Sequence, residues 1–227
     1  MIRVRKGSPP TELVTYRASL DSTADPPRAA RYDGPGFELV KPRVREALVR
    51  DQRGLCCYCM ARIEASESKM KIEHRVPQRG PSGDASRDLD WTNLFGACCG
   101  AIPRASGSAV THCDSSKGDA SISIDPSEDT HTRAISYERN GRVTSSFAQH
   151  QRDIDDVLNL NCDELRARRV DAVQELKQWL STKYPDRGYP SDKLRLLRDK
   201  VLSEPEGRPY LGFLAWWLER AATKAAR

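Results

Sequence analysis

An acidic residue stands directly before a histidine, Glu73-His74, in the run of residues 71–77. A neutral imidazole can take a proton from water near neutral pH. A carboxylate can bind a hard divalent cation such as Mg²⁺, and so can the side chains of Asn93 and Asp114, which follow in the chain. Hydrolysis of a phosphodiester needs an activated water and a cation on the phosphate oxygens, so these residues are a minimal set for that reaction.

Six of the seven cysteines lie between Cys56 and Cys113, on both sides of this pair. In a reducing cytosol such clustering favours metal binding over disulfides. Cys56 and Cys59 have the Cys-x-x-Cys spacing that lets two thiolates converge on one ion. Cys98 and Cys113 would complete a tetrahedral structural zinc site, with Cys99 as the alternative to Cys98. Because an all-sulfur zinc site leaves no open position, any catalytic cation must bind elsewhere.

The elements around these residues are expected to be short strands. Met70, Ile72 and Val76 alternate as in a β-strand. Glu73 and His74 would point to opposite sides of an extended chain, so a bend or a paired hairpin must bring them to one centre. A further strand is predicted over residues 121–124. A two-residue hairpin turn is predicted at Asn140-Gly141.

Helices are expected on both sides of this region. Residues 1–39 contain several Pro and Gly pairs and predict an extended arm without regular elements. A helix is predicted from Pro42 to Gln52. Helical periodicity starts at Asp153 and continues in helices from about Glu164, from Ser191 and from Pro209. The sequence thus predicts an α+β fold, with an extended N-terminal arm at residues 1–40, a core at 41–150 and a helical C-terminal region at 151–227.

The bulk properties indicate a soluble protein. Charged residues make up 30% of the 227 positions, and no apolar run reaches membrane-spanning length. No apolar segment follows the basic N-terminus, so a secretory signal is not expected and a cytoplasmic location is. The net charge is +5, but residues 51–150 carry twelve Lys/Arg against thirteen Asp/Glu. The nearly neutral core suggests that attraction for phosphate comes from other segments or from a partner.

A set of short motifs resembles the HNH endonuclease (ββα-metal) family with its accessory zinc. The motifs are Cys56 to Cys59, Ile72-Glu73-His74 with Pro77, Asn93-Leu94, Cys98, and Cys113-Asp114-x-x-Lys117. The arrangement is closer still to the PtuB-like subfamily, the HNH partner of Septu antiphage systems and of some retron systems. Tyr32-Asp33-Gly34-Pro35 and Asn93-Leu94-Phe95-Gly96 also carry this likeness, which reaches to about Leu180.

The resemblance implies a role for each matching residue. His74 would be the general base, and Asn93 would orient His74 or its loop. Glu73 and Asp114 would be ligands of a catalytic Mg²⁺ or Mn²⁺. Many HNH enzymes have His or Asn at the position of Asp114, which leaves His112 as its competitor. Lys117, expected at the surface, could contact a phosphate.

The expected function is therefore that of a metal-dependent HNH endonuclease acting in an antiphage defence complex. The resemblance implies nucleic acid as substrate, with DNA favoured over tRNA, and a PtuA-like ATPase as partner. A tRNA-cleaving nuclease of a retron system is one alternative. A non-catalytic zinc-binding adaptor of the ATPase is another.

Overall fold

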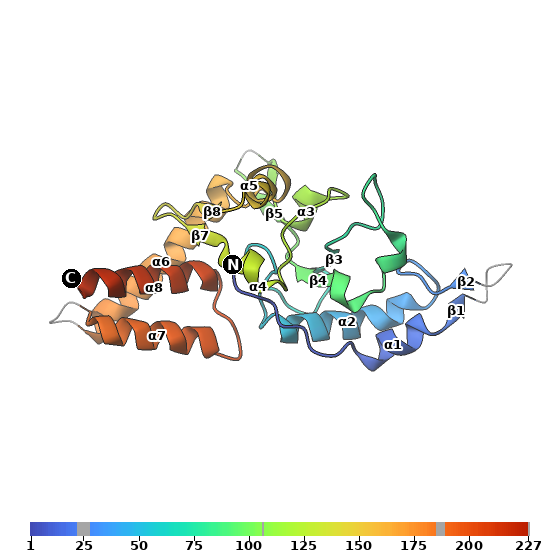
Figure 1. Cartoon of the computed structure of the whole chain (residues 1–227), viewed down its shortest axis with the longest axis horizontal. Helices are drawn as coiled ribbons and strands as arrows, with labels where there is room; N and C mark the ends of the chain where they lie inside the picture. Colours follow the sequence, from blue (N-terminus) through green and yellow to red (C-terminus); the bar gives the residue numbers. More distant parts are fainter. Residues whose placement is uncertain (22–27, 106, 185–188, 227) are drawn as a thin grey trace.

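Four separate antiparallel hairpins contain the strands of the described chain (Figure 1). The computed structural model describes residues 1–21, 28–105, 107–184 and 189–226. The hairpins join β1 (Leu20–Asp21) to β2 (Arg28–Ala29), β3 (Lys71–His74) to β4 (Leu94–Ala97), β5 (Ala101–Pro103) to β6 (Ala109–Thr111), and β7 (Ile135–Tyr137) to β8 (Val143–Ser145). Helices surround these hairpins, which confirms the α+β class.

The N-terminal segment is more regular than the sequence predicts. It contains helix α1 (Thr11–Arg17), and helix α2 runs over Phe37–Asp51, so the predicted start at Pro42 is wrong and the expected boundary at residue 40 falls inside a helix. Pro42 costs α2 one backbone hydrogen bond. Phe37 and Val40 lie before it and are buried, and their burial stabilises the additional turn.

The segment before α1 is extended, as expected, and lies on the core. The Val4 amide donates to the carbonyl of Pro126 at 2.8 Å, and the Gly7 amide donates to Asp51 at 2.7 Å. The indole of Trp91 donates to the carbonyl of Gly7 at 2.8 Å. These bonds join the arm to three distant parts of the chain.

The predicted strand at residues 121–124 is wrong. The amide and hydroxyl of Ser123 and the amide of Ile124 all donate to one carboxylate oxygen of Asp153, at 2.6, 2.6 and 3.0 Å. Because Asp153 satisfies these donors, the segment needs no partner strand. The predicted hairpin at Asn140-Gly141 is confirmed as β7–β8, but Glu138 pairs with Arg142 and the loop has three residues instead of two.

Short helices connect the hairpins. They are the 3₁₀ turns Ala85–Arg87 and Trp91–Asn93, and helices α3 (Asp114–Lys117), α4 (Asp129–Arg133) and α5 (Ala148–Arg152). A π-helical turn over Asp153–Val157 continues α5. The helical stretch predicted from Asp153 therefore begins five residues earlier, and it crosses the expected boundary at residue 150.

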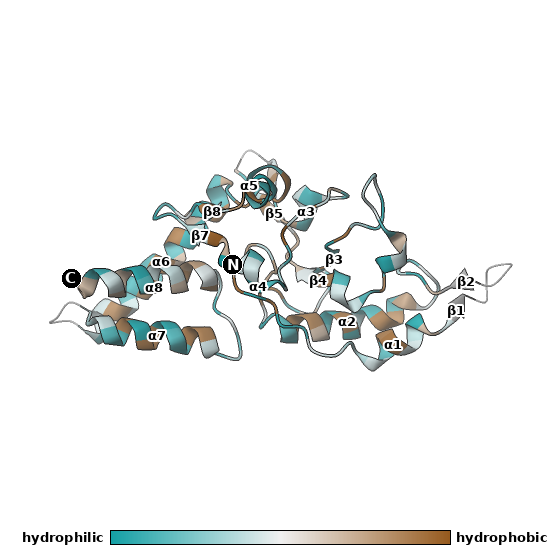
Figure 2. Cartoon of the chain, in the orientation of Figure 1, coloured by the Kyte–Doolittle hydropathy of each residue, from teal (hydrophilic) through white to brown (hydrophobic). Residues whose placement is uncertain are grey.

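Three longer helices form the C-terminal region, which confirms its predicted helical character: α6 (Asp163–Lys183), α7 (Ser191–Ser203) and α8 (Leu211–Ala225). They gather at one end of the molecule, with α7 and α8 packed together (Figure 1). Hydrophobic residues recur along α8, and its buried residues include Leu211, Phe213 and Leu218 (Figure 2). No helix in the described ranges combines the length and the apolar character needed to cross a membrane.

The helical region contacts the core through the loop that carries the first two cysteines of the predicted zinc site. The Tyr210 amide donates to the carbonyl of Met60 at 2.8 Å, and the Gly207 amide donates to that of Arg53 at 2.8 Å. Arg62 donates in turn to the carbonyl of Gly207 at 2.7 Å. The cysteine loop and the C-terminal helices therefore support each other.

Candidate functional site: a histidine, two carboxylates and a cysteine cluster

The β3–β4 hairpin positions the Glu73-His74 pair. Glu73 is paired with Phe95 and His74 with Leu94 in the antiparallel register. Gln52, at the end of α2, holds β4 from its other side: its amide nitrogen donates to the carbonyl of Gly96 at 2.7 Å, and its oxygen accepts from the Gly96 amide at 2.6 Å. Both edges of β4 are thus bonded, which fixes the strand opposite the pair.

His74 is held by a backbone carbonyl. Its Nε2 lies 2.9 Å from the carbonyl oxygen of Asp88, and since a carbonyl only accepts, Nε2 carries the proton. In the neutral ring this leaves the lone pair on Nδ1. The ring of Tyr32 packs edge-on against the imidazole, with 4.6 Å between centroids. Burial lowers the pKa of His74, so the ring favours its neutral, basic form.

Asn93 holds the segments on both sides of His74 in place. Its Oδ1 accepts from the amide of Val76 at 2.8 Å, and its Nδ2 donates to the carbonyls of Val76 and Arg87 at 3.0 and 3.1 Å. Val76 is two residues after His74, and Arg87 immediately precedes Asp88. Asn93 therefore orients the loop that follows β3 and the carbonyl that bonds the imidazole.

Glu73 lies on the other side of β3 and is only 2% exposed. The hydroxyl of Tyr58 donates to its Oε1 at 2.8 Å, and Nζ of Lys117 lies 3.0 Å from the same oxygen. Burial, followed by a hydrogen bond with Asp114, raises the pKa of Glu73 to about 8. Lys117 lowers this pKa, but burial is the larger effect, so the Glu73 carboxyl holds a proton readily near neutral pH.

Asp114 is the first residue of α3 and lies beside Glu73. It shares the hydrogen bond with Glu73 and makes an ion pair of 3.0 Å with Lys71. Burial alone would raise the pKa of Asp114, but the hydrogen bonds from Glu73 and Lys71 hold it below its ordinary value. The carboxyl groups of Glu73 on β3 and Asp114 on α3 thus lie side by side, although the two residues are far apart in sequence.

Lys117 is not the surface residue expected from the sequence. It is 3% exposed, and its Nζ donates to the carbonyl of His74 at 2.9 Å in addition to pairing with Glu73. One helical turn separates it from Asp114, so α3 directs both side chains toward β3. Its charge compensates Glu73 and is not free to contact a phosphate.

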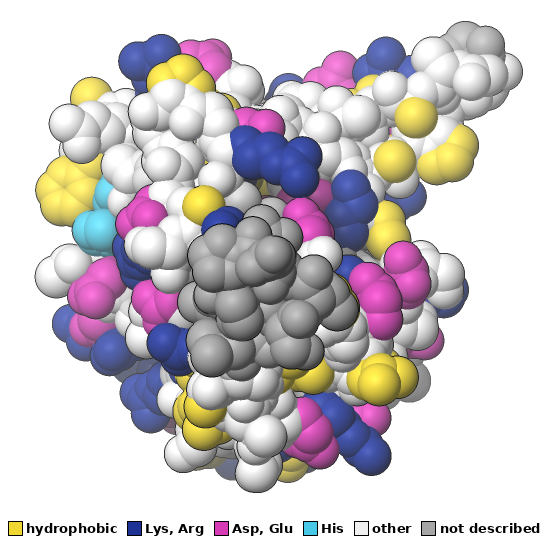
Figure 3. Space-filling view, turned by 90° about the vertical axis from the view of Figure 1, so that its right-hand side faces the viewer, with side chains coloured by type: hydrophobic (Ala, Val, Ile, Leu, Met, Phe, Trp, Pro, Cys, Tyr) yellow, Lys and Arg dark blue, Asp and Glu magenta, His cyan; other side chains and the backbone are white. Residues whose placement is uncertain are grey.

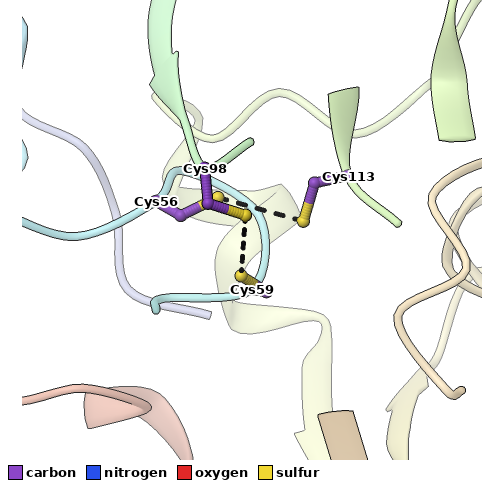
Figure 4. Close-up of side chains that lie close together, drawn as sticks. All are labelled: Cys56, Cys59, Cys98 and Cys113. Atoms are coloured by element: carbon purple, nitrogen blue, oxygen red, sulfur yellow. Dashed lines mark hydrogen bonds between the residues drawn. The ribbon is translucent and has the colours of Figure 1, made fainter. Parts of the chain in front are cut away.

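Cys56, Cys59, Cys98 and Cys113 form a buried cluster in which all ligand atoms lie within 4.8 Å of one another (Figure 4). The Sγ–Sγ distance is 3.9 Å for Cys56 and Cys113, and 3.7 Å for Cys59 and Cys98. Tetrahedral zinc with Zn–S bonds of about 2.3 Å requires sulfurs about 3.8 Å apart. Disulfides would bring them to about 2.05 Å. The cluster therefore fits a structural zinc ion.

The two open alternatives concern Cys99 and His112. Cys99 points out of the cluster, and its Sγ donates to the carbonyl of Ser68 at 3.3 Å, so Cys98 is the member from this pair. His112 lies at the cluster, with Nδ1 3.2 Å from Sγ of Cys113. Cys113 has a positive φ of 53°, and the chain turns there between His112 at the cluster and Asp114 at Glu73.

The described part of the chain contains no second group of three or more side chains preorganised for a metal. Glu73 and Asp114 lie together, but His74 faces the other side of β3, so the hairpin does not bring Glu73 and His74 to one centre as the sequence predicts. The two carboxyl groups have Lys71 and Lys117 as partners. A cation at Glu73 and Asp114 would thus compete with Lys71, which is about half exposed and able to turn away.

Several residues of this site are not identified by the sequence. Tyr58 lies between two cysteines of the predicted zinc loop, and that position was its only signal. Lys71 precedes the pair on β3 and has the character of an ordinary surface lysine. Asp88 acts on His74 through its backbone carbonyl, for which no side-chain pattern exists.

No protein-family model matches the sequence. A search of curated proteins likewise finds no match.

Proposed function

We propose that this protein is a metal-dependent HNH endonuclease that hydrolyses phosphodiester bonds in nucleic acid, with DNA as the favoured substrate. The order β3, β4, α3 fits a ββα-metal core, with the β5–β6 hairpin inserted before the helix. The observation that carries the proposal is the state of His74: its Nε2 is committed to the Asp88 carbonyl, and its Nδ1 is the basic nitrogen. The buried Glu73 on the same hairpin and the partly exposed Asp114 on α3 form a pair of carboxyl groups.

In this mechanism His74 is the general base. Its Nδ1 accepts a proton from a water molecule, the water oxygen bonds to phosphorus, and the bond from phosphorus to the leaving oxygen breaks. Asn93 holds the loop after β3 and the segment that carries the Asp88 carbonyl in place. The imidazole therefore keeps its proton on Nε2. Tyr32 limits rotation of the ring.

Glu73 and Asp114 are the proposed ligands of Mg²⁺ or Mn²⁺. Their oxygen donors suit a hard divalent cation, and their shared hydrogen bond brings them close enough to contact one ion. The bound ion would stabilise negative charge on the phosphate and leaving oxygens. Lys117 neutralises part of the charge of Glu73 at all times. The cysteine cluster would hold zinc for structure only.

The biological setting is part of the proposal. Resemblance to PtuB-like proteins supports a role as the nuclease of an antiphage complex with a PtuA-like ATPase. The same resemblance keeps tRNA open as a substrate. A non-catalytic adaptor is the second candidate, because both carboxylates have lysine partners in this structure.

The test uses the protein copurified with the ATPase encoded beside it. The complex is incubated with duplex DNA and with tRNA, in Mg²⁺, in Mn²⁺ or in EDTA, with and without ATP. We expect cation-dependent cleavage that falls about 10²-fold or more in His74→Ala, the scale of lost general-base catalysis. His131→Ala is the matched control, since His131 lies on α4 and accepts from the Asp125 amide.

An adaptor would give a different pattern. His74→Ala would then assemble with the ATPase and protect cells from phage as well as the wild type does. Cleavage that persists in EDTA would contradict the metal requirement. Cleavage of tRNA without cleavage of DNA would assign the substrate to RNA.

A further inference from the structure

Three cations on β3, on α3 and directly after β3 are already paired with carboxylates. Lys71 is 3.0 Å from Asp114, Lys117 is 3.0 Å from Glu73, and Arg75 is 3.0 Å from Asp125. On the end of the molecule that carries α1, basic and acidic side chains are intermingled (Figure 3). A nucleic acid with a uniformly negative backbone gains little from such a surface. Capture of the proposed substrate therefore requires basic side chains elsewhere.

A groove between α6 and α8 carries such basic side chains. It encloses a cavity of about 760 Å³ and is lined by the basic residues Arg139, Lys177, Arg220 and Lys224. None of the described residues that line it is acidic. We call this surface the α6–α8 groove. Asp171 and Glu175 of α6 line a different cavity together with Arg168, so neither of these acidic side chains lines the α6–α8 groove.

Aromatic rings lie among the cations of the groove. Phe213 and Trp217 belong to its lining. Nζ of Lys177, on α6, is 5.5 Å from the ring of Trp217 on α8. The guanidinium of Arg220 is 5.6 Å from the ring of Trp216. Arg220 and Lys224 are one helical turn apart, so their charges follow one wall of the groove.

We propose that the α6–α8 groove binds a single-stranded segment of nucleic acid, and that it supplies the substrate capture that the nuclease core lacks. This inference rests on the proposed function for the identity of its ligand. Grooves that bind single strands combine cations for the backbone with aromatic faces for unstacked bases. An acidic protein segment would pair with the cations, but its carboxylate side chains would not stack on the ring of Trp217 as a base does. The interleaving of rings and cations favours the nucleic acid.

The test measures binding apart from cleavage. A fluorescein-labelled single-stranded oligonucleotide is titrated with full-length protein in EDTA, and anisotropy is recorded at several salt concentrations. Arg220→Glu/Lys224→Glu should weaken binding by at least about tenfold. The slope of log affinity against log salt should fall by about 1.4, since each phosphate contact to a single strand contributes about 0.7.

A matched control separates the groove from general charge. Arg17→Glu/Arg195→Glu changes net charge equally at exposed positions on α1 and α7, and it should bind within about twofold of wild type. Trp217→Leu should weaken binding by about tenfold, the scale of one lost base stack. Melting temperatures of all variants verify that they fold.

Three outcomes would overturn the inference. One is wild-type affinity in Arg220→Glu/Lys224→Glu, and another is an equal loss in the control variant. The third is displacement of the oligonucleotide by a polyglutamate peptide of equal charge at equal concentration, which would assign the groove to an acidic protein. His74→Ala keeps the two proposals distinct: it should bind like wild type even though cleavage is lost, and a protein that binds but never cleaves would refute only the nuclease.

Discussion

The choice of a carbonyl as the partner of His74 matters for its chemistry. A carboxylate partner would fix the same tautomer, but it would also stabilise the imidazolium and raise the pKa of the ring. The Asp88 carbonyl fixes Nε2–H without a full negative charge. Burial lowers the pKa of His74 below its ordinary value, and it is a larger effect than this hydrogen bond, which raises the pKa. The residue is thus suited to accept a proton during a reaction and not to hold one beforehand.

Lys71 is expected to compete with the catalytic cation. Its Nζ is 3.0 Å from Asp114 and its side chain is about half exposed, so the ion pair contributes at most about 1 kcal/mol. Lys71→Met should therefore tighten Mn²⁺ binding by up to about fivefold, as measured by titration calorimetry. Lys69→Met, at an exposed position just before β3, is the control. Unchanged or weaker Mn²⁺ binding in Lys71→Met would show that the ammonium does not compete.

The cysteine cluster predicts one zinc ion per chain. Elemental analysis of denatured protein should find about one zinc, and Cys113→Ser should lose it together with much of the folding free energy that the metal supplies. Cys99→Ser is the matched control, because Cys99 lies next to Cys98 but bonds to Ser68. Zinc retained by Cys113→Ser, or lost from Cys99→Ser, would contradict the assignment of ligands.

At the level of elements, Gln52 joins α2 to the β3–β4 hairpin. Its side chain is buried and makes bonds of 2.6 to 2.8 Å to Gly96 and to the carbonyl of Leu55. Gln52→Ala removes the partner of the Gly96 amide, while the Gly96 carbonyl still accepts from the Cys57 amide. The substitution should lower the free energy of unfolding by about 1–3 kcal/mol, as measured by urea denaturation. Gln178→Ala, exposed on α6, should change it by less than about 0.5 kcal/mol. Equal losses would mean that Gln52 does not brace β4.

The elements also show how far the sequence could be interpreted. The zinc ligands Cys56 and Cys59 are encoded in a local spacing, and the hairpin at Asn140 in a local turn preference, so both were predictable. The choice of Cys98 over Cys99 depends on how β4 ends, which no local pattern specifies. The early start of α2 depends on burial of Phe37 against distant residues. Tertiary contacts determine which of Cys98 and Cys99 joins the cluster and where α2 begins, and local sequence patterns do not specify such contacts.

The Glu73-His74 pair illustrates the same limit. The sequence predicts a paired hairpin at these residues, and β3–β4 is that hairpin, but it does not bring the two side chains to one centre. The sequence does not predict the partners of Glu73, because Tyr58 and Lys117 are distant from it along the chain, one before it and one after it. The burial of Lys117 follows from where α3 packs, and a lysine pattern alone indicates a surface position.

Considered as a whole, the molecule joins the region that contains the hairpins to a helical region that carries the α6–α8 groove. The relative position of the two parts depends on a few close contacts. Gly141, in the β7–β8 loop, lies against the backbone of α6: an added Cβ there would be 2.4 Å from the carbonyl oxygen of Arg166. The buried Arg169 of α6 also donates to the carbonyl of Gly141 at 3.0 Å. Moving the loop away from α6 would break the hydrogen bond from Arg169, and moving it closer would bring the two backbones into steric overlap.

Gly141→Ala should displace α6 from the core, and Gly107→Ala is its matched control. Both glycines have φ near 80°, so each substitution costs about 1–2 kcal/mol in backbone conformation. Gly107 has open space around its Cβ position, whereas Gly141 meets Arg166. Gly141→Ala should therefore lose about 1–3 kcal/mol more in urea unfolding. Its amides in α6 should exchange hydrogen faster, while those of β3 and β4 keep their protection. Equal destabilisation by the two variants would mean that the Gly141 contact does not hold the helical region to the core.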